Sequence, residues 1–496
     1  MPASLLAESL MIGVAANVAA PPAVLLRLLD SAGQPAWRTL CRERGLPDEV
    51  IEAVLVHPER RVRASFARNG HVDPAHRGRL VEDPDPFVRV ALASGPAAHA
   101  GPPRPLPDEA IERLLTMRDP DGRTPAVTAD EIREELVGSG QIPHAFRRAA
   151  LTHPHPILRA FAAGMWLFLT PAQREPLLAD SAPEVQKVVE WHQRLLDPGF
   201  VESDLPDRDC HYRSMLLVNY AISHAVAERC VAEGRDLWAL AGNPHTPYEF
   251  IERLACDPDP KVRARVASRC DIAPDLLAEL ADGPEGMVRT RALVHEAPRT
   301  EPQRQMIDCC IGRSADEIGP IHEGFNPPSP DWFATCAVSG HPLLRRIAAT
   351  YRLLPDDLAD RLARDPDDEI CHLLAYNHPF APPRLLLDAF IAARRQRPHL
   401  LAHPRLPRTG LADLLDHEDP EVRVLAAADP TLPSAPLAEL DDPDPRVRAA
   451  AATNPLMPIE VLERMLTDPD RAQAAASNAS LSAEHLHDLL TRAGIP

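Results

Sequence analysis

Lysine, aromatic residues and clustered cysteines are scarce in this sequence, and basic side chains are outnumbered by acidic ones. Among 496 residues there are 53 basic and 72 acidic side chains, and only two of the basic ones are lysine. The net charge of −19 would repel a polyanion over most of the surface, because non-specific affinity for DNA or RNA comes from many contacts of Lys and Arg with phosphates. The composition therefore argues against nucleic acid as the partner.

The nine cysteines lie far from one another, except for the adjacent Cys309 and Cys310, so they form neither a disulfide framework nor a zinc-finger spacing. Together with Cys336 and His341, the adjacent pair offers ligands for a zinc ion. The Cys-x-x-Cys spacing is missing, however, and buried cysteines are common small core residues. We therefore expect no metal and no cofactor, in a protein of the reducing cytoplasm. No stretch approaches ~18 uninterrupted apolar residues, so we expect no membrane span.

What the sequence does contain is a repeat that runs from end to end. Residues 442–470 read DPDPRVRAAAATNPLMPIEVLERMLTDPD, and residues 257–289 read DPDPKVRARVASRCDIAPDLLAELADGPEGMVR. We index each copy by an anchor, the apolar residue of its Val-Arg pair. The anchors recur mostly every 24 to 27 residues, which predicts a solenoid of about seventeen units. The clear anchors are Trp37, Val62, Val88, Ile132, Leu158, Val262, Val288, Leu344, Ile370, Val422 and Val447. Weaker anchors fall at Leu10, Val185, Asp236, Gly319, Gln396 and Arg471.

Each unit predicts two short helices. In the copy at 442–470, Asp444 is placed to cap a first helix, and Pro445 suits its first turn, where no backbone donor is needed. Val447 and Ala451 share one face of this helix, and Asn454 suits a left-handed turn that ends it. Neither helix buries its apolar face alone, so neighbouring units must stack.

The second helix of the same copy begins at Pro458 and ends at Asp468-Pro469. Glu460 lies in the first turn, where the positive end of the helix dipole stabilises a negative charge. Four apolar residues form the stripe that this helix buries. They are Val461, Leu462, Met465 and Leu466.

Three stretches interrupt the pattern. Residues 96–128 insert loops, and the copy at 296–330 is long and ends in the turn-rich NPPSP. Residues 197–235 keep no clear anchor, and their part RSMLLVNYAISHAVAERCVAEG predicts one longer helix. We divide the chain into N-terminal repeats (1–196, with the insertion at 96–128), an irregular helical segment (197–235) and C-terminal repeats (236–496).

At these residues the chain resembles the leucine-rich repeat variant family, whose units run DPDPxVRxxxAxNPxxPxxxLxxL, and more distantly the HEAT-like α-solenoids. The resemblance implies an all-α, right-handed, armadillo-like superhelix of helix pairs. One known family member carries a cysteine-ligated iron-sulfur module before its repeats. Because no closely spaced cysteine cluster occurs here, the resemblance does not extend to that module.

An aspartate and an arginine recur four residues apart at the start of the first helices. One interpretation is a ladder of arginines that grips phosphates or an acidic partner. The simpler one, which we favour, is that each arginine pairs with a capping aspartate of its own or the next unit and ties repeats together. The pairs are Asp85 with Arg89, Asp259 with Arg263, and Asp444 with Arg448.

Eleven of the 21 aromatic residues fall between positions 146 and 250. Large side chains can fill space where the repeat geometry changes, which is the simpler interpretation. Alternatively, some of them are exposed and anchor a partner, because Trp, Tyr and Arg dominate interface hot spots. Trp166, Trp191 and Tyr212 are the candidates for such contacts.

Catalytic motifs such as the P-loop, Gly-x-Ser-x-Gly and His-Glu-x-x-His do not occur. We therefore expect a non-enzymatic scaffold that binds a protein or an extended peptide, with basic character to complement the acidic chain. The alternative is a HEAT-like solenoid that binds nucleic acid, or an enzyme similar to the solenoid DNA glycosylases. That function requires an arginine-lined groove with an acidic or aromatic pocket.

Overall fold

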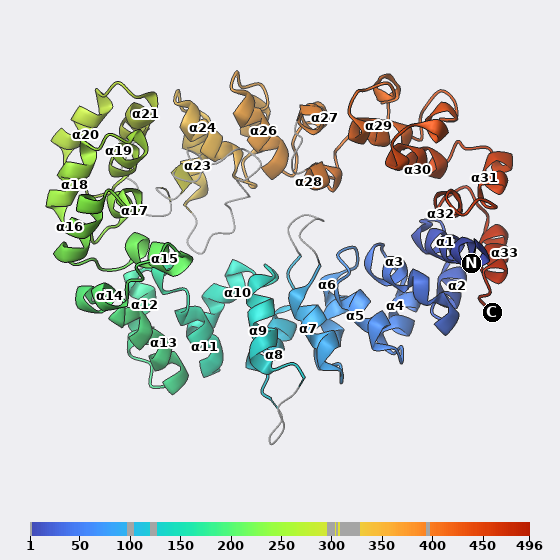
Figure 1. Cartoon of the computed structure of the whole chain (residues 1–496), viewed down its shortest axis with the longest axis horizontal. Coiled ribbons are helices and arrows are strands. Elements are labelled where there is room, and N and C mark those ends of the chain that lie inside the picture. Colours follow the sequence, from blue (N-terminus) through green and yellow to red (C-terminus); the bar gives the residue numbers. More distant parts are fainter. Residues whose placement is uncertain are drawn as a thin grey trace. The chain divides into compact units, whose positions relative to one another are not determined.

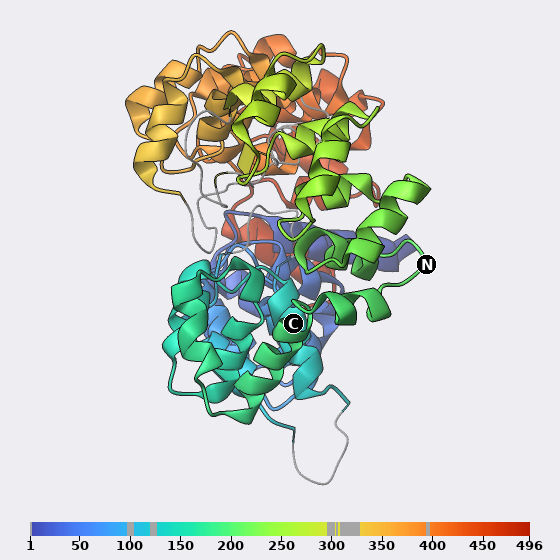
Figure 2. The same ribbon diagram turned by 90° about the vertical axis from the view of Figure 1, so that its left-hand side faces the viewer.

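In the computed structural model, every regular element of the described residues is an α-helix or a short 3₁₀ helix (Figure 1). The all-α prediction is therefore confirmed, and the chain is a helical repeat solenoid of paired short helices (Figure 2). Its handedness and the count of about seventeen units stay predictions. The structure describes residues 2–96, 104–119, 126–294, 303, 306–307, 328–392 and 397–496.

The chain forms two compact units, and unit 1 is built from two separate stretches of sequence. Unit 1 comprises Met1–Pro143 and Leu386–Pro496, and unit 2 comprises His144–Leu385. The segment 197–235, set apart in the sequence, lies inside unit 2. α27 (Pro383–Ala392) crosses the boundary of the two units.

In unit 1 the first helices of successive repeats pack on one another. α1, α3, α5, α7 and α9 form one such series, and α29, α30 and α32 form another. α32 also packs on α1, so the last repeat lies beside the first as a neighbour (Figure 1). The helices in the N-terminal stretch are α1 (Pro2–Ala16), α2 (Pro22–Arg27), α3 (Trp37–Arg42), α4 (Asp48–Leu55), α5 (Arg60–Ala67), α6 (Pro74–Gly78), α7 (Pro86–Ser94), α8 (Asp108–Thr116) and α9 (Ala129–Gly138). Those in the C-terminal stretch are α28 (Arg397–Leu401), α29 (Pro420–Ala427), α30 (Pro445–Thr453), α31 (Ile459–Met465), α32 (Ala472–Ala476) and α33 (Ala483–Arg492). Four 3₁₀ helices accompany them: η1 (Ser31–Ala36), η2 (Arg79–Glu82), η7 (Ala412–Leu414) and η8 (Ala438–Asp441).

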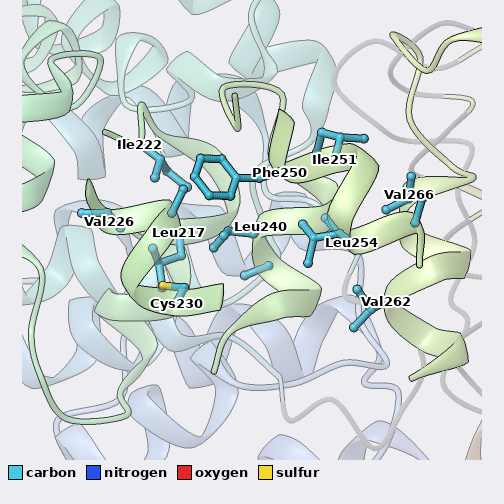
Figure 3. Close-up of a cluster of buried hydrophobic side chains, with 14 of the residues drawn as sticks. Leu217, Ile222, Val226, Cys230, Leu240, Phe250, Ile251, Leu254, Val262 and Val266 are labelled. Atoms are coloured by element: carbon cyan, nitrogen blue, oxygen red, sulfur yellow. The ribbon is translucent and has the colours of Figure 1, made fainter. Parts of the chain in front are cut away.

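Unit 2 repeats the arrangement. α15, α17, α19 and α21 pack in series, and their apolar side chains join those of α16 and α18 in one buried cluster that includes Leu217, Phe250 and Val262 (Figure 3). The helices of this unit are α10 (His144–Ala149), α11 (Pro156–Ala163), α12 (Pro171–Leu178), α13 (Pro183–Arg194), α14 (Pro198–Asp204), α15 (His211–Asn219), α16 (His224–Glu233), α17 (Leu237–Gly242), α18 (Tyr248–Ala255), α19 (Pro260–Val266), α20 (Pro274–Ala281), α21 (Gly286–Val294), α23 (Pro330–Ala337), α24 (Pro342–Ala349), α25 (Asp356–Leu362) and α26 (Asp368–Asn377), with the 3₁₀ helices η4 (Ala150–Thr152) and η5 (Trp166–Phe168).

The predicted caps of the first helices are confirmed. The side chains of Asp85, Asp259 and Asp444 each accept a hydrogen bond from a backbone N–H in the first turn, and a proline follows each of them. The aspartate satisfies a donor that the helix leaves unpaired, and the proline already has the φ that the helix needs. The first helices therefore begin where the sequence predicts.

Some arginines tie neighbouring repeats together, but through an aspartate other than the capping one. Of the three arginines named from the sequence, Arg263 pairs with Glu285 of the next repeat, whereas Arg89 and Arg448 donate to carbonyl oxygens at the start of their own repeats. Arg423 makes two hydrogen bonds, of 2.9 and 3.0 Å, to Asp442, which lies two residues before the capping Asp444 of the next repeat. Its third nitrogen donates to carbonyl oxygens at the start of its own repeat. We call this arrangement the arginine rung. Asp442 also accepts the backbone N–H of Asp444, so one carboxylate serves both the turn before the helix and the guanidinium of the preceding repeat. The same rung joins Arg63 to Asp83, Arg159 to Asp180, and Arg345 to Asp365.

Asn454 does not adopt the predicted left-handed conformation. Its φ of −64° and ψ of 129° are extended, and its buried amide donates to the carbonyl oxygens of Ala427 and Asp429 in the preceding repeat, both at 2.8 Å. We call this arrangement the asparagine rung. Buried carbonyl oxygens at a helix end need donors, and the amide of the next repeat supplies them. Asn69, Asn243 and Asn478 make equivalent bonds.

Two predictions about the irregular stretches need correction or addition. The single long helix expected over 213–234 is wrong, because α15 ends at Asn219 and Ser223 caps the separate helix α16. The insertion at 96–128 contains helix α8, which packs beside α9. The weak anchors Gly319 and Gln396 lie outside the described residues, as does most of the copy at 296–330.

Candidate functional site

An open pocket of about 610 Å³ lies on unit 1, lined by α7, α9 and the residues that lead into α9. In each of these two helices the anchor, Val88 or Ile132, is buried, so the lining comes from the remaining, exposed side of the helix. Six side chains give the pocket its character. They are Phe87, Val90, Val127, Glu131, Glu134 and Glu135.

The three glutamates make the pocket acidic. Glu131 accepts hydrogen bonds from the backbone and hydroxyl of Thr128 in the capping box of α9. Glu135 lies 2.6 Å from the hydroxyl of Ser94 on α7. Among the described residues, Glu134 has no hydrogen-bond or ion-pair partner, so its carboxylate is available to a ligand.

Apolar surface lies beside these carboxylates. The ring of Phe87 is 44% exposed, and the guanidinium of Arg60 lies over it at 5.0 Å from the ring centroid. Val90 and Val127 are half-buried in the same lining. A long cationic side chain fits such a surface, because its aliphatic stem packs on apolar groups while its charged end meets carboxylates.

The structure places Trp166 in the core, which favours the packing interpretation of this residue. Only 3% of it is exposed, and its ring stacks on His192 with centroids 5.9 Å apart. His192 in turn stacks on Tyr220 at 6.5 Å. Burial, with a smaller contribution from the charge of Arg174, lowers the pKa of His192. The three rings therefore form a buried stack in which the imidazole is held neutral.

Trp191 and Tyr212 reach the surface of unit 2. Trp191 is 43% exposed and meets the ring of Phe200 edge-on, with centroids 6.3 Å apart. Tyr212 is half-buried, and its hydroxyl donates a hydrogen bond to Asp204. Burial, together with this hydrogen bond, raises the pKa of Tyr212 to about 12. The structure does not place the buried Trp166 on one surface with Trp191 and Tyr212.

The rung arginines do not form a free cationic ladder. Where the rung is complete, as at Arg63 and Arg423, carboxylate and carbonyl oxygens occupy all three guanidinium nitrogens. A phosphate would have to displace these internal partners. This arrangement supports the interpretation of the arginines as ties between repeats.

Metal ligands do not gather in the described part of the chain, where no group of three or more His, Cys, Asp or Glu could hold an ion. His341 caps α24 through its imidazole, and Cys336 is buried in α23. Cys309 and Cys310 lie outside the described residues.

Sequence reasoning missed the acidic pocket because no motif carries it. Its residues on α7 and α9 occupy positions written x in the repeat DPDPxVRxxxAxNP, where side chains vary without affecting the stack, whereas Ala126, Val127 and Ser139 lie outside those positions. The available signal was the position of the residues on α7 and α9 relative to the anchor of each repeat. Most of them lie one residue before the anchor, two residues after it or six residues after it. These offsets give Phe87, Val90 and Ser94 on α7, and Glu131, Glu134 and Gly138 on α9.

Comparison with known families supports the repeat assignment at its clearest copy. The family model described as leucine rich repeat variant matches residues 445–470, which hold α30, α31 and the loop between them. This segment is therefore similar to that family. Several other repeats of this chain share its aspartate cap or its asparagine rung. The comparison with curated proteins gave no match. None of the described helices is both long and apolar enough to cross a membrane.

Proposed function

We propose that this leucine rich repeat variant solenoid is a non-enzymatic scaffold of the cytoplasm that binds an extended basic segment of another protein. The observation that supports this most directly is the open pocket of unit 1, where three carboxylates lie beside exposed apolar surface. The net charge of −19 attracts a basic partner at long range. The pocket then selects a lysine or arginine flanked by an apolar residue.

A displayed library of random peptides, incubated with the full chain, tests this function. We expect the retained peptides to be enriched in Lys or Arg next to an apolar residue. The substitution Glu134→Lys reverses one charge of the pocket. It should lower the affinity for the retained peptides by about tenfold or more, because an attraction between close opposite charges becomes a repulsion. The matched control is Glu463→Lys on the second helix α31, which changes the net charge equally at a distant exposed position.

Two outcomes would contradict the proposal. One is a library that yields no enrichment. The other is an equal loss of binding on Glu134→Lys and Glu463→Lys, which would assign the effect to net charge alone. A gel shift at low salt addresses the alternative function. Retarded DNA or RNA would favour a nucleic-acid-binding solenoid over a peptide scaffold.

The exposed aromatic residues of unit 2 are a second proposed contact. Trp191 is exposed and is the kind of side chain that anchors interfaces. Trp191→Ala should weaken capture of the partner with a change in unfolding free energy of about 0.5 kcal/mol or less. Trp166→Ala is the contrasting variant, since removal of a buried indole should destabilise unit 2 by about 3–5 kcal/mol. Equal destabilisation by both changes would make Trp191 a packing residue.

A further inference from the structure

The two stretches of unit 1 meet at one joint, where the last repeat of the chain packs on the first. α1 lies against α32 and α33, and α2 lies against α33 (Figure 1). All of unit 2 separates these segments in the sequence. The joint is therefore a repeat interface that no short loop connects.

The joint uses the same asparagine rung as repeats that follow one another in the chain. The buried amide of Asn17 donates to the carbonyl oxygens of Ala476 and Asn478, at 3.1 and 2.7 Å. Asn478 in turn donates to Ala452 and Asn454 of the repeat before it. The first repeat is thus hydrogen-bonded to the last repeat in the same way as a repeat that follows directly in the sequence.

Steric fit at the joint is specific. A Cβ at Gly13 would lie 2.4 Å from the carbonyl oxygen of Gln473 and 2.6 Å from the Cβ of Ala476, so α1 approaches α32 more closely than any side chain at position 13 allows. The faces that meet are apolar, since Leu10 and Val14 of α1 are almost completely buried. The surfaces are complementary and different from each other.

Arg27 supplies a second fastening found at this joint. Its guanidinium donates to the backbone carbonyls of His487 and Ile495, at 2.9 and 2.7 Å, and to the hydroxyl of Thr491 at 3.0 Å. The arginine rung cannot form from α32, because the position that follows the weak anchor is Ala472 and not arginine. The joint therefore depends on contacts that can be altered separately from those of other repeats.

We propose that this joint is an exchangeable interface, at which a second copy of this chain can supply either half. Two different complementary surfaces on one molecule either close within that molecule or join molecules head to tail. The joint closes within one chain as long as the protein concentration is below the effective concentration of one end of the chain around the other. This effective concentration is of order millimolar for ends joined by short flexible links, and it is lower for these ends, which all of unit 2 separates in the sequence. Above it, or when the joint opens in a crowded assembly, the first repeat of one copy binds the last repeat of another.

Complementation between two damaged copies of the full chain tests the proposal. Gly13→Leu blocks the first repeat and leaves the last repeat intact, whereas Ala476→Leu does the reverse. Each variant alone should be monomeric, because neither its own ends nor those of an identical copy fit. An equimolar mixture should form a heterodimer, in which the intact first repeat of the Ala476→Leu copy binds the intact last repeat of the Gly13→Leu copy.

Native mass spectrometry of differently isotope-labelled copies would detect that heterodimer directly. A second pair, Arg27→Ala with His487→Arg, changes half-buried side chains at the edge of the joint and decides the matter if the first pair does not fold. In this pair too, the mixture should dimerise more than either variant alone. Folded variants whose mixtures stay monomeric throughout a concentration series would overturn the proposal.

Discussion

The repeat at 442–478 displays its motif in full, whereas the segment 211–243 shows almost none of it, yet both fold into the same paired helices. In the first region Asp442 forms an ion pair with Arg423. In the second region Asp236 forms one with Arg213, with 2.6 Å between a carboxylate oxygen and a guanidinium nitrogen. Asn454 and Asn243 each donate to two carbonyl oxygens of the preceding repeat. The rungs and the buried apolar positions, more than the motif letters, define a repeat.

The two regions reach the same rung by different backbone routes. Asp236 has a φ of 59°, and no other described non-glycine residue has a positive φ. This conformation is unfavourable for most residues, although aspartate tolerates it better than most. The more deeply buried guanidinium of Arg213, 3% exposed against 15% for Arg423, lies opposite it.

Burying a charge should give the largest effect, and it should be equal in the two regions if both are true repeats. Leu217→Asp and Val447→Asp each place a carboxylate at a fully buried position and should lower the free energy of unfolding by about 4 kcal/mol or more. Urea denaturation combined with hydrogen exchange measures this. Ser214→Asp on the exposed side of α15 is the control, and a small effect of Leu217→Asp would show that 211–243 is not a repeat.

Removing the rung arginine should affect the two regions unequally. Arg213→Met should cost about 3 kcal/mol and Arg423→Met about 1–2 kcal/mol, because water screens the hydrogen bonds of the more buried guanidinium less. Denaturant melts of the variants measure the difference. Adding Asp236→Asn to Arg213→Met removes a carboxylate that would keep only the 3.7 Å contact with Arg235, and it should recover part of the loss. Equal losses would mean that burial does not set the strength of the rung.

Removing the rung asparagine should again affect both regions alike. Asn243→Ala and Asn454→Ala each leave two buried carbonyl oxygens without their amide donor, at a cost of about 1–3 kcal/mol. Local hydrogen exchange of α17 and α30 reports the change. A loss confined to Asn454→Ala would show that the asparagine matters only where the motif is complete.

As the pH falls, the two regions should lose stability at different pH values. The pKa of His192, which stacks on Tyr220, is lowered from 6.5, so the unfolded state binds a proton first and stability falls as pH drops below about 6.5. The hydrogen bond from Arg423 lowers the pKa of Asp442 below 3.8, so its contribution persists above that value and is lost only as pH falls through the lower folded pKa. Hydrogen exchange across a pH series should therefore show α13 and α15 opening first, and His192→Phe should abolish that early step.

Much of the fold could be predicted because its determinants are local. Asp444 and Pro445 mark a helix start, and the spacing of Val447 and Ala451 marks its buried face. The segment at 211–234 was not recognised because the break between α15 and α16 rests on Ser223, whose capping role depends on the chain turning at Tyr220. The aromatic candidates for partner contacts could be named from the sequence. Which of them are buried between the stacked repeats could not be predicted from it.

The sequence by itself determined that short capped helices alternate along the chain, because caps and apolar spacing act within a few residues. Only the tertiary structure decided which aspartate each arginine meets, why Asn454 is extended, and that α1 follows α32 as the next neighbour. Those outcomes depend on buried carbonyls and carboxylates brought together from distant positions. A donor such as Asn17 finds its acceptors only when another repeat arrives beside it.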